Sequence, residues 1–499
     1  MQALINGYLA LVDPVRPRIG DSVDKPVNRE SEVDDLFSTE MADTAFDFGS
    51  DIIARIMPRD RDWLTYETVE TLPDEIKVQI EEPLKLRTKK IFDAIRASNL
   101  YDEGLSEWSL DMGHGTGGLM ITDPGFGQAD YVEAIAPHQL LIVRGARGLR
   151  FKGRECAWTL AEALAYWPNY DWPPEFRKRA ADDKDGCKRV IVGEYATRIP
   201  DPGDERWKWQ VVVDGHLAYE QELKGRGSCP IIVSRWRTIQ STAWGLGPLL
   251  PAVPNGRVLD QVSYLMLKSL GKNVDPPFFY DDDGTLNFDA GLTPGSAIPR
   301  EKGSRIDFWE PSSRLDVGYF QEAKLEDKVR RAGFQAGPRQ RGLTPPTAFQ
   351  WADEKAEEGR RLEMPTGKLY AEAVLSIVER FEFMLMERGA IDELIPVEGR
   401  AEAIRARPQN PLARQQDYES VQTTLQLLNG ANAAFGPQAT AAEVDVRGTL
   451  EKMKSKTNDQ NLVLRPKQQA DEYMRGVLGQ PGMAPGLETA PAGAEAPPV

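Results

Sequence analysis

The centre of the chain changes abruptly from a strand pattern to a helical pattern. An apolar run ends in residues 234–237 (SRWR), and residues 244–248 (WGLGP) follow after a short polar stretch. Glycine and proline at this density interrupt regular structure and favour a tight turn. From Val253 to residue 272 apolar residues recur at three- and four-residue steps, which predicts a long helix. A strand is therefore expected to pass through one turn into a long helix.

The patterns before this turn predict helices first and an antiparallel sheet second. Helices are expected over residues 30–57, 84–98, 102–112 and 159–167. Strands are expected over residues 119–122, 131–136, 140–143, 149–152, 189–199, 206–213, 217–223 and 230–237. The Asp214–Gly215 pair adds a strong hairpin signal. Residues 168–186, with their prolines, aspartates and lysines, are expected to form an exposed insertion. The fold class predicted is α+β.

The patterns after the turn are mainly helical. A Pro-, Gly- and Asp-rich stretch at 275–311 predicts a small β-containing excursion between the first long helix and a charged helix at 314–334. A loop is expected next, from Ala336 to Pro346. Further helices are expected over residues 347–363, 368–388, 412–429, 441–455 and 466–478. The tail from residue 480 is rich in Pro, Ala and Gly and is expected to be disordered.

Several motifs in a fixed order resemble those of one family. Residues 234–248 combine the Arg-Trp pair with the Gly/Pro turn, and residues 410–416 read NPLARQQ. Residues 57–63 (MPRDRDW) and 464–466 (LRP) are further matches. Together they resemble the head-to-tail connector (portal) proteins of short-tailed bacteriophages, over roughly residues 30–478. Trp244 and Asn410 stand where Tyr and Ser are commoner in that family.

The resemblance implies a portal fold with a helical and antiparallel β wing, a two-helix stem, a small β-containing clip and a helical crown. The implied parts are an N-terminal extension (1–29), the wing (30–245), the first stem helix (246–273), the clip (274–312), the second stem helix (313–335), the tunnel loop (336–345), wing helices (346–400), the crown (401–479) and a disordered tail (480–499).

The resemblance also implies a function and partners. Portal proteins form rings, typically of twelve subunits, at one vertex of the capsid, and DNA enters and leaves the head through the ring. The implied partners are further copies of the chain, double-stranded DNA held without sequence specificity, the terminase large subunit, major capsid and scaffolding proteins, and tail adaptor proteins. The expected location is the virion, after assembly in the host cytoplasm.

Candidate residues follow from this assignment. Lys268 and Lys272 lie one turn apart near the end of the first long helix, and Arg339 and Arg341 lie in a Gly-rich loop. These four are expected to contact phosphates in the channel; the alternatives are a solvated helix end and an ordinary surface loop. The apolar residues expected to pack on a neighbouring subunit are Leu259, Val262 and Met266.

The composition and the remaining motifs favour a protein that is not an enzyme. The net charge of −16 disfavours tight duplex binding and suits a conduit through which DNA slides. Residues 113–118 (GHGTGG) lack the ending of a phosphate loop, and the predicted helix precedes the strand, so a flexible turn is expected there. The three cysteines and three histidines lack metal-binding spacing, residues 281–284 (DDDG) lack calcium-loop spacing, and no metal or cofactor is expected. No signal peptide or membrane span is expected.

Three functions remain to be compared. The first is a structural ring that conducts DNA. The second is a phosphate-processing enzyme built around residues 113–118 and nearby acids, and the third is a soluble adaptor or scaffold that never encloses DNA. A central channel in the assembled particle distinguishes the first from the others.

Overall fold

The computed structural model describes residues 1–275, 278–281, 297–300, 315–335, 365–392 and 404–453, apart from short gaps at 26, 69–73, 126–127, 147, 169, 201–204, 410, 437–443, 445–447 and 451. The chain divides into two compact units, Met1–Pro411 and Leu412–Val499. Helices and mainly antiparallel sheets make up the first unit, so the α+β class is confirmed. The second unit contains most of α12 (Pro411–Phe435). In the described part of the chain, no helix is both long and apolar enough to cross a membrane.

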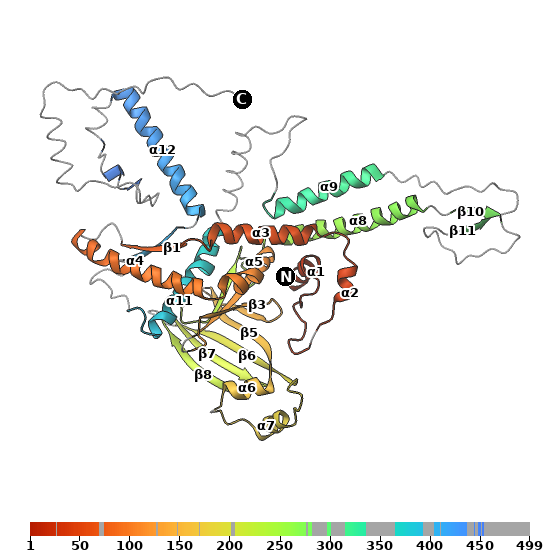
Figure 1. Cartoon of the computed structure of the whole chain (residues 1–499), viewed down its shortest axis with the longest axis horizontal. Helices are drawn as coiled ribbons and strands as arrows, with labels where there is room; N and C mark the ends of the chain where they lie inside the picture. The colour runs from red at the N-terminus through yellow and green to blue at the C-terminus, as the bar shows by residue number, and fades with distance from the viewer. Residues whose placement is uncertain are drawn as a thin grey trace, which may run out of the picture. The chain divides into compact units, whose positions relative to one another are not determined.

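A shared hydrophobic core joins the helices of the first unit to a small sheet (Figure 1). Its deepest side chains include Tyr8, Phe48, Trp108 and Phe381, each at most 2% exposed. The helices that contribute to it are α1 (Gln2–Val12), α3 (Glu40–Ile56), α4 (Asp74–Ala97), α5 (Leu105–His114), α8 (Val253–Val274), α9 (Leu315–Ala332) and α11 (Leu375–Glu387). Short helical turns also lie in this unit: α2 (Glu30–Asp34), the π-helical η1 (Leu100–Gly104) and η3 (Tyr370–Val374), and the 3-10 turn η2 (Leu250–Ala252).

Two antiparallel sheets form the larger β part of the first unit. The three-stranded sheet has the order β3 (Tyr131–Ile135), β2 (Thr116–Thr122), β9 (Ile231–Arg235). The five-stranded sheet has the order β4 (Leu140–Arg144), β5 (Leu149–Thr159), β6 (Arg189–Ile199), β7 (Arg206–Val213), β8 (His216–Lys224). Burial alternates along β7, where Trp207, Trp209, Val211 and Val213 face the second core as the sequence pattern predicts.

The segment between β5 and β6 contains the helix predicted at 159–167 and the insertion predicted at 168–186, which is mostly exposed. It contains α6 (Leu160–Tyr166), which begins with a capping box formed by Thr159 and Glu162, and α7 (Pro174–Ala181). Trp172 and Phe176 are buried, and their rings stack with 4.4 Å between centroids. The insertion therefore adds apolar side chains to the core of the five-stranded sheet, although its charged residues are mostly exposed.

Helices α8 and α9 lie side by side as a hairpin (Figure 1). Leu259 and Met266 of α8 are buried, as are Leu325 and Val329 of α9. Between the two helices, β10 (Phe278–Asp281) and β11 (Ala297–Arg300) pair in parallel, which agrees with the predicted β-containing excursion.

Three local features differ from the sequence prediction. The single helix expected over residues 30–57 is interrupted before α3, because the Asp260 carboxylate of α8 accepts hydrogen bonds from the backbone N–H groups of Phe37 and Ser38. Helix α4 begins ten residues earlier than expected, at Asp74. The strand pair β1 (Leu64–Thr68) and β12 (Ile404–Pro408) was not predicted, because its partners are more than 300 residues apart and each is short.

The predictions for the tunnel loop (336–345), the helices at 347–363 and 466–478 and the tail from 480 fall outside the described residues, as does most of the helix expected at 441–455. They stay predictions.

Candidate functional site

The structure brings together two glycine-rich segments that the sequence treats as separate motifs. Residues 113–118 join α5 to β2, and residues 244–248 follow β9 and precede α8. The backbone N–H of Gly247 donates to the carbonyl of His114 (2.9 Å), and that of Leu249 donates to the carbonyl of Gly113 (3.1 Å). The N–H of Gly245 donates to the Thr116 hydroxyl (2.7 Å). We call residues 113–118 with residues 244–249 the junction.

Glycine is required at the junction because the two backbones touch. Gly115 ends α5 with φ +101°, a left-handed conformation that favours glycine. A Cβ atom on Gly115 would lie 2.2 Å from the nitrogen of Gly247, and one on Gly247 would lie 2.2 Å from the carbonyl oxygen of Gly113. Residues 113–118 are all buried. The predicted turn between a helix and a strand is confirmed, but it is packed rather than flexible, and its backbone has no open cradle for a phosphate.

A cluster of buried charged side chains lies next to the junction, between α5 and the segment that follows α1. Asp111, which is fully buried, accepts from Arg16 (2.7 Å) and lies 3.2 Å from Nε2 of His114. Arg16 also pairs with Glu107 at 3.0 Å. Burial opposes the charge of the guanidinium, but the carboxylates of Asp111 and Glu107 nevertheless raise the pKa of Arg16. This cluster fixes the segment after α1 against α5.

The N-terminal helix α1 is an integral part of the same core. Tyr8 is fully buried and donates from its hydroxyl to the carbonyl of Leu110 (2.8 Å). Burial raises the pKa of the Tyr8 phenol well above its usual range, with Asp111 adding to the effect. Gly7 leaves room for Arg257 of α8, since a Cβ there would lie 2.3 Å from Nη2 of that arginine. Residues 1–29 were assigned as an extension by resemblance, but α1 contacts both α3 and α8.

Helix α8 starts directly at the junction. The 3-10 turn η2 leads into it, and Pro254 occupies the first turn, where a missing N–H costs nothing. Gly256 then allows α3 to approach, because a Cβ on it would lie 2.6 Å from Cγ of Met41. The predicted passage from strand through turn to long helix is confirmed, and its direction is fixed by packing on α1 and α3.

Helix α11 is tied to the rest of the first unit by charged side chains. Arg380 donates to three backbone carbonyls, of Ile121 (3.1 Å), Gly227 (3.2 Å) and Ser228 (2.8 Å). Burial lowers the pKa of this arginine to about 10. Glu382 accepts from Arg87 of α4 (2.5 Å). Sequence reasoning missed these residues, because their partners lie more than 150 residues away and no local pattern marks them.

The candidate residues from the sequence are placed as follows. Leu259 and Met266 are 1% and 8% exposed, within the same chain, and Val262 is half-buried. The first two are buried within their own chain, where α8 packs on α9. Lys268 is exposed, with Nζ 5.7 Å from the Tyr264 ring centroid, and Lys272 is half-buried. Arg339 and Arg341 lie outside the described residues.

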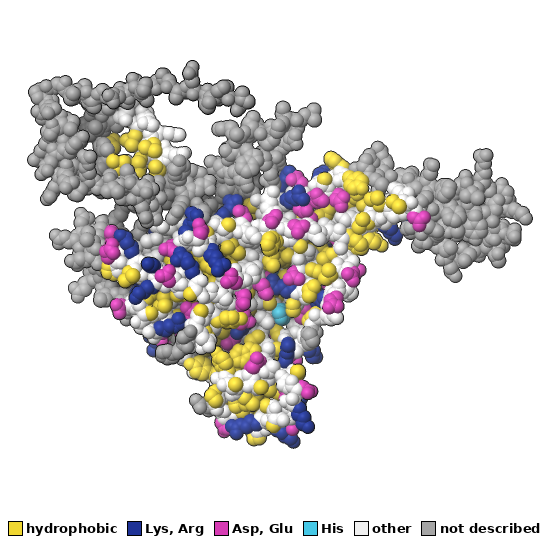
Figure 2. Space-filling model, in the orientation of Figure 1, with side chains coloured by type: hydrophobic (Ala, Val, Ile, Leu, Met, Phe, Trp, Pro, Cys, Tyr) yellow, Lys and Arg dark blue, Asp and Glu magenta, His cyan; other side chains and the backbone are white. Residues whose placement is uncertain are grey.

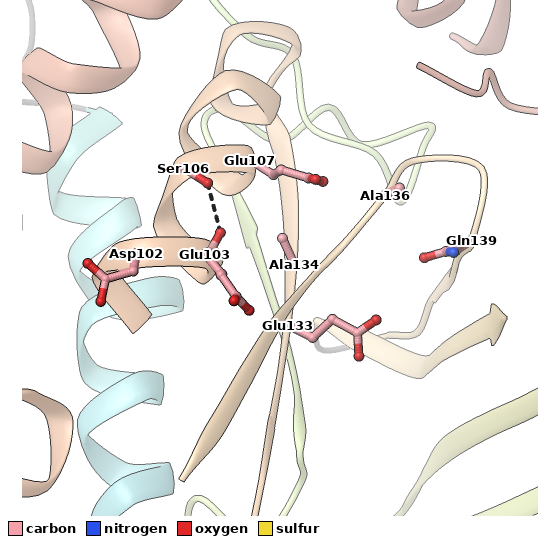
Figure 3. Close-up of a pocket in the computed structure, with 8 residues that line it drawn as sticks. All are labelled: Asp102, Glu103, Ser106, Glu107, Glu133, Ala134, Ala136 and Gln139. Atoms are coloured by element: carbon pink, nitrogen blue, oxygen red, sulfur yellow. Dashed lines mark hydrogen bonds between the residues drawn. The ribbon is translucent and has the colours of Figure 1, made fainter. Parts of the chain in front are cut away.

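A cavity of about 440 Å³ lies beside η1 and β3 (Figure 3). Its carboxylates come from Asp102, Glu103, Glu107 and Glu133. Figure 3 shows the Asp102 side chain turned away from the others, so the four do not converge on one point. Within the described ranges, no group of three or more His, Cys, Asp or Glu side chains could hold a metal ion. The cavity therefore does not define a site.

Comparison with known proteins gives one strong match. The sequence profile of the family described as bacteriophage head to tail connecting protein matches residues 8–458. Among curated protein sequences, no relative matches.

Solved structures of gene transfer agent (GTA) particles are also similar. A chain in the virion of the native particle has 14% identity and a TM-score of 0.35, covering 86% of this chain and 95% of that one. A chain in the neck of the empty particle, computed with C6 symmetry, has 14% identity and a TM-score of 0.35, covering 84% and 93%. A chain in the neck of the native particle, computed with C12 symmetry, has 14% identity and a TM-score of 0.29, covering 81% and 91%. The family match spans nearly the whole chain, and the protein therefore belongs to the bacteriophage head-to-tail connecting proteins, which are structural components of the virion.

Proposed function

We propose that this connecting protein works as a portal: a closed ring of identical subunits, twelve in number, at one vertex of the capsid. DNA passes through the central channel during packaging and ejection. The observation that carries the proposal is the exposed apolar surface of the α8–α9 hairpin (Figure 2). The proposed role is structural and involves no catalysis.

The exposed apolar residues of α8 lie on two opposite sides of the helix. Val258 and Leu265, 46% and 60% exposed, are seven residues apart and share one side. Leu267 and Val274, 57% and 80% exposed, share another. Each residue of the second pair follows one of the first by nine positions, and at about 100° per residue this places the pairs roughly opposite each other. Burying both sides requires a partner on each.

Two different sides that both need a partner are typical of a head-to-tail contact. One side of the hairpin packs on the opposite side of the next copy, and a closed rotation then gives a ring. Tyr319 and Phe320 of α9 are 52% and 71% exposed and add to this surface. The interface residues that we now propose are the exposed Val258, Leu265, Leu267 and Val274, in place of Leu259 and Met266.

The charge distribution supports a channel that lets DNA slide. The net charge of −16 repels phosphates in general, so a few cations provide weak, salt-sensitive contacts. Lys268 lies nine residues after Leu259 and therefore on the side of α8 opposite the buried face. We propose that it contacts phosphates together with Lys272, and that Arg339 and Arg341 form a collar of guanidinium groups around the duplex.

The partners proposed are those of a portal. The terminase large subunit supplies the ATP-driven motion, since this sequence has no Walker motif. Major capsid and scaffolding proteins surround the ring, and tail adaptor proteins dock below it. The proposed wing, stem, clip and crown have the boundaries given above, with α8 and α9 as the two stem helices.

Electron microscopy and native mass spectrometry of the purified chain test the proposal. Wild type is expected to form rings with a central channel. Leu265→Asp and Leu267→Asp each place a charge in one side of the interface, which costs several kcal/mol at every copy, so subunits without rings are expected. Leu265→Met is the matched control, because methionine keeps an apolar side chain of similar volume at the same position. Its rings should persist.

Three results would contradict the proposal. Normal rings from both leucine variants would show that these sides of α8 are not the interface. A monomeric wild type without a channel would favour the alternative, a soluble adaptor of the particle. Phosphatase or nucleotidase turnover by wild type would favour the enzyme alternative.

A further inference from the structure

Three cationic side chains gather at the loop that follows β9. The loop consists of residues 238–245 and is closed by an antiparallel bridge between its first and last residues. Arg144, at the end of β4, and Lys368, in the helical turn before η3, both bind the loop from outside. Arg237 directly precedes the loop and is exposed. We call Arg144, Arg237 and Lys368 the basic cluster.

The two arginines of the basic cluster keep hydrogen-bond donors for a further acceptor. Nη1 of Arg144 donates to the carbonyls of Ile239 (3.0 Å) and Gln240. A guanidinium has five N–H groups, and those on Nε and Nη2 of Arg144 have no partner among the described residues. The side chain of Arg237 likewise forms no hydrogen bond or ion pair within the described ranges. Both guanidinium groups can therefore donate to an added anion.

Glu372 is the one carboxylate that binds these cations in the part of the chain that the structure describes. It accepts from three N–H groups of Arg235: the backbone N (3.0 Å), Nε (3.2 Å) and Nη2 (2.6 Å). Nζ of Lys368 lies 3.5 Å from the same carboxylate and donates to the Thr238 hydroxyl (2.9 Å). Because one carboxylate serves both Arg235 and Lys368, positive charge remains in excess.

The like charges around Lys368 repel one another. Burial lowers the pKa of Lys368, and the guanidinium groups of Arg235 and Arg144 add to this shift against the opposing effect of Glu372. An anion held between these groups would relieve the repulsion. The excess of cations also contrasts with the whole sequence, whose net charge is −16. A local surface of this sign attracts anions to one place on an otherwise acidic chain.

The chemistry and the exposure of the basic cluster fit a phosphodiester backbone. Guanidinium groups bind phosphate oxygens through two parallel N–H groups, and lysine adds a point charge. Arg144 and Arg237 are exposed, so the cluster is an open surface rather than a closed pocket. On an open surface a single phosphate stays in water, whereas a polyanion gains from several contacts at once because each contact releases counterions.

We propose that Arg144, Arg237 and Lys368 bind phosphate groups of double-stranded DNA. The loop that they surround leads into the junction from which α8 starts, whereas Lys268 and Lys272 lie near the end of that helix. The basic cluster would thus contact the duplex at a different position from those two lysines. The choice of DNA as the anion rests on the proposed function, but the excess of positive charge at the loop does not.

Fluorescence anisotropy of a labelled duplex of about 20 base pairs, titrated with the full chain at about 50 and 200 mM salt, tests this inference. Arg237→Gln and Lys368→Gln are each expected to weaken binding about five-fold at the lower salt concentration. Each should also reduce the slope of log K against log salt by about 1. The matched control is Lys178→Gln, because Lys178 is exposed on α7 and its loss changes the net charge equally. This control should bind the duplex as wild type does.

The proposal is overturned if wild type does not bind the duplex at the lower salt concentration, or if Lys178→Gln weakens binding as much as the two cluster variants. The latter result would mean that total charge, and not the basic cluster, controls binding. Displacement of the duplex by inorganic phosphate at the same concentration of phosphate groups would also overturn it, because the cluster would then bind a free anion.

Native mass spectrometry of the same samples reports separately on ring formation. Failure of wild type to form rings would contradict the proposed function, whereas duplex binding that depends on Arg237 and Lys368 would still establish the phosphate site.

Discussion

The junction and the α8–α9 hairpin differ in how completely their side chains are buried within one chain. At the junction, residues 113–118 are buried completely, and backbone donors of residues 244–249 find acceptors within the same chain. On the hairpin, large apolar side chains such as Leu265 and Phe320 are 60% and 71% exposed. The junction is buried within a single subunit, whereas the hairpin leaves apolar surface exposed.

This difference divides the molecule by the step at which each part becomes stable. A self-contained junction lets the subunit fold and sets the direction of α8 before any neighbour is present. An exposed apolar strip lowers the stability of the isolated subunit, and burial of the strip on association raises the stability of the assembled one. Substitutions at the junction should therefore fail at folding, whereas substitutions on the outer sides of α8 should fail only at assembly.

The largest expected effect is at Gly115. Gly115→Ala is expected to prevent folding, because the added Cβ would lie 2.2 Å from the Gly247 nitrogen and the backbone there cannot move aside. Gly125→Ala is the matched control: it has φ +103°, close to the +101° of Gly115, but nothing lies within 4 Å of its added Cβ. The control should lose only about 1–2 kcal/mol, the cost of the left-handed conformation.

The measurement is the yield of soluble chain, followed by urea unfolding of whatever is folded. If Gly115→Ala and Gly125→Ala lost the same stability, the conformation alone would matter, and close backbone contact would not define the junction.

The second prediction compares buried and exposed leucines of the same helix. Leu259→Asp is expected to reduce the free energy of unfolding of the subunit by about 3–5 kcal/mol, because it buries an unpaired charge. Leu265→Asp should change it by less than about 0.5 kcal/mol, since that side chain is exposed in the isolated subunit. Urea unfolding under conditions that dissociate oligomers measures both. Equal losses would remove the distinction between the two faces of α8.

The sequence predicted much of the architecture but little of the junction. Local patterns were enough for β6 and β7, where alternation is regular, and for α8, where Gly and Pro mark the start of a helical period. Contact between residues 113–118 and 244–248 was not predictable from one sequence, because each glycine motif looks like a simple turn until the other is beside it. The resemblance supplied the family, which is confirmed, but not the physical reason for its glycines.

The same limit applies to the interface residues expected from the sequence. Leu259, Val262 and Met266 follow the helical period, and a period shows which side of a helix is apolar but not what covers it. In the structure α9 covers the most regular stripe, and the leucines that break the pattern stay exposed. The packing of α8 on α9, which follows it in the chain after β10 and β11, therefore decides which side of α8 is buried.

A third prediction compares one hydroxyl in each region. Thr116 is 1% exposed and accepts from the N–H of Gly245 (2.7 Å), so Thr116→Val leaves a buried donor without its partner and should cost about 2 kcal/mol. Ser263 of α8 donates to Glu322 of α9 (2.7 Å) in a half-buried setting, and Ser263→Ala should cost only about 1 kcal/mol. Urea unfolding at pH 7 compares them. A larger loss from Ser263→Ala would mean that the hairpin is held as tightly as the junction.

The smallest expected effect concerns Glu379, a half-buried carboxyl that lies outside both the junction and the hairpin. Glu379 lies on α11 where this helix meets the turn at residue 227; a Cβ on Gly227 would lie 2.1 Å from the Glu379 carbonyl oxygen. Burial raises the pKa of the Glu379 carboxyl to about 7; Arg226 opposes the shift, whereas Glu205 and Glu382 add to it. Ionisation of this carboxyl therefore reduces the stability of the folded chain.

The sign of the pH dependence follows from the direction of that shift. An unfolded glutamate has a pKa of about 4.3, so between about pH 4.5 and pH 7 the folded chain holds the proton more tightly than the unfolded chain. The contribution of Glu379 to stability is thus fully present below about pH 4.5 and is lost as pH rises to 7. The stability of Glu379→Gln relative to wild type should rise by about 1 kcal/mol between pH 5 and pH 8, less than the full shift because the side chain keeps some contact with water. Urea unfolding of both chains at pH 5, 6, 7 and 8 gives the difference. If the difference in free energy of unfolding between the two chains stays constant from pH 5 to pH 8, Glu379 does not titrate in this range, and its burial on α11 does not destabilise the charged form.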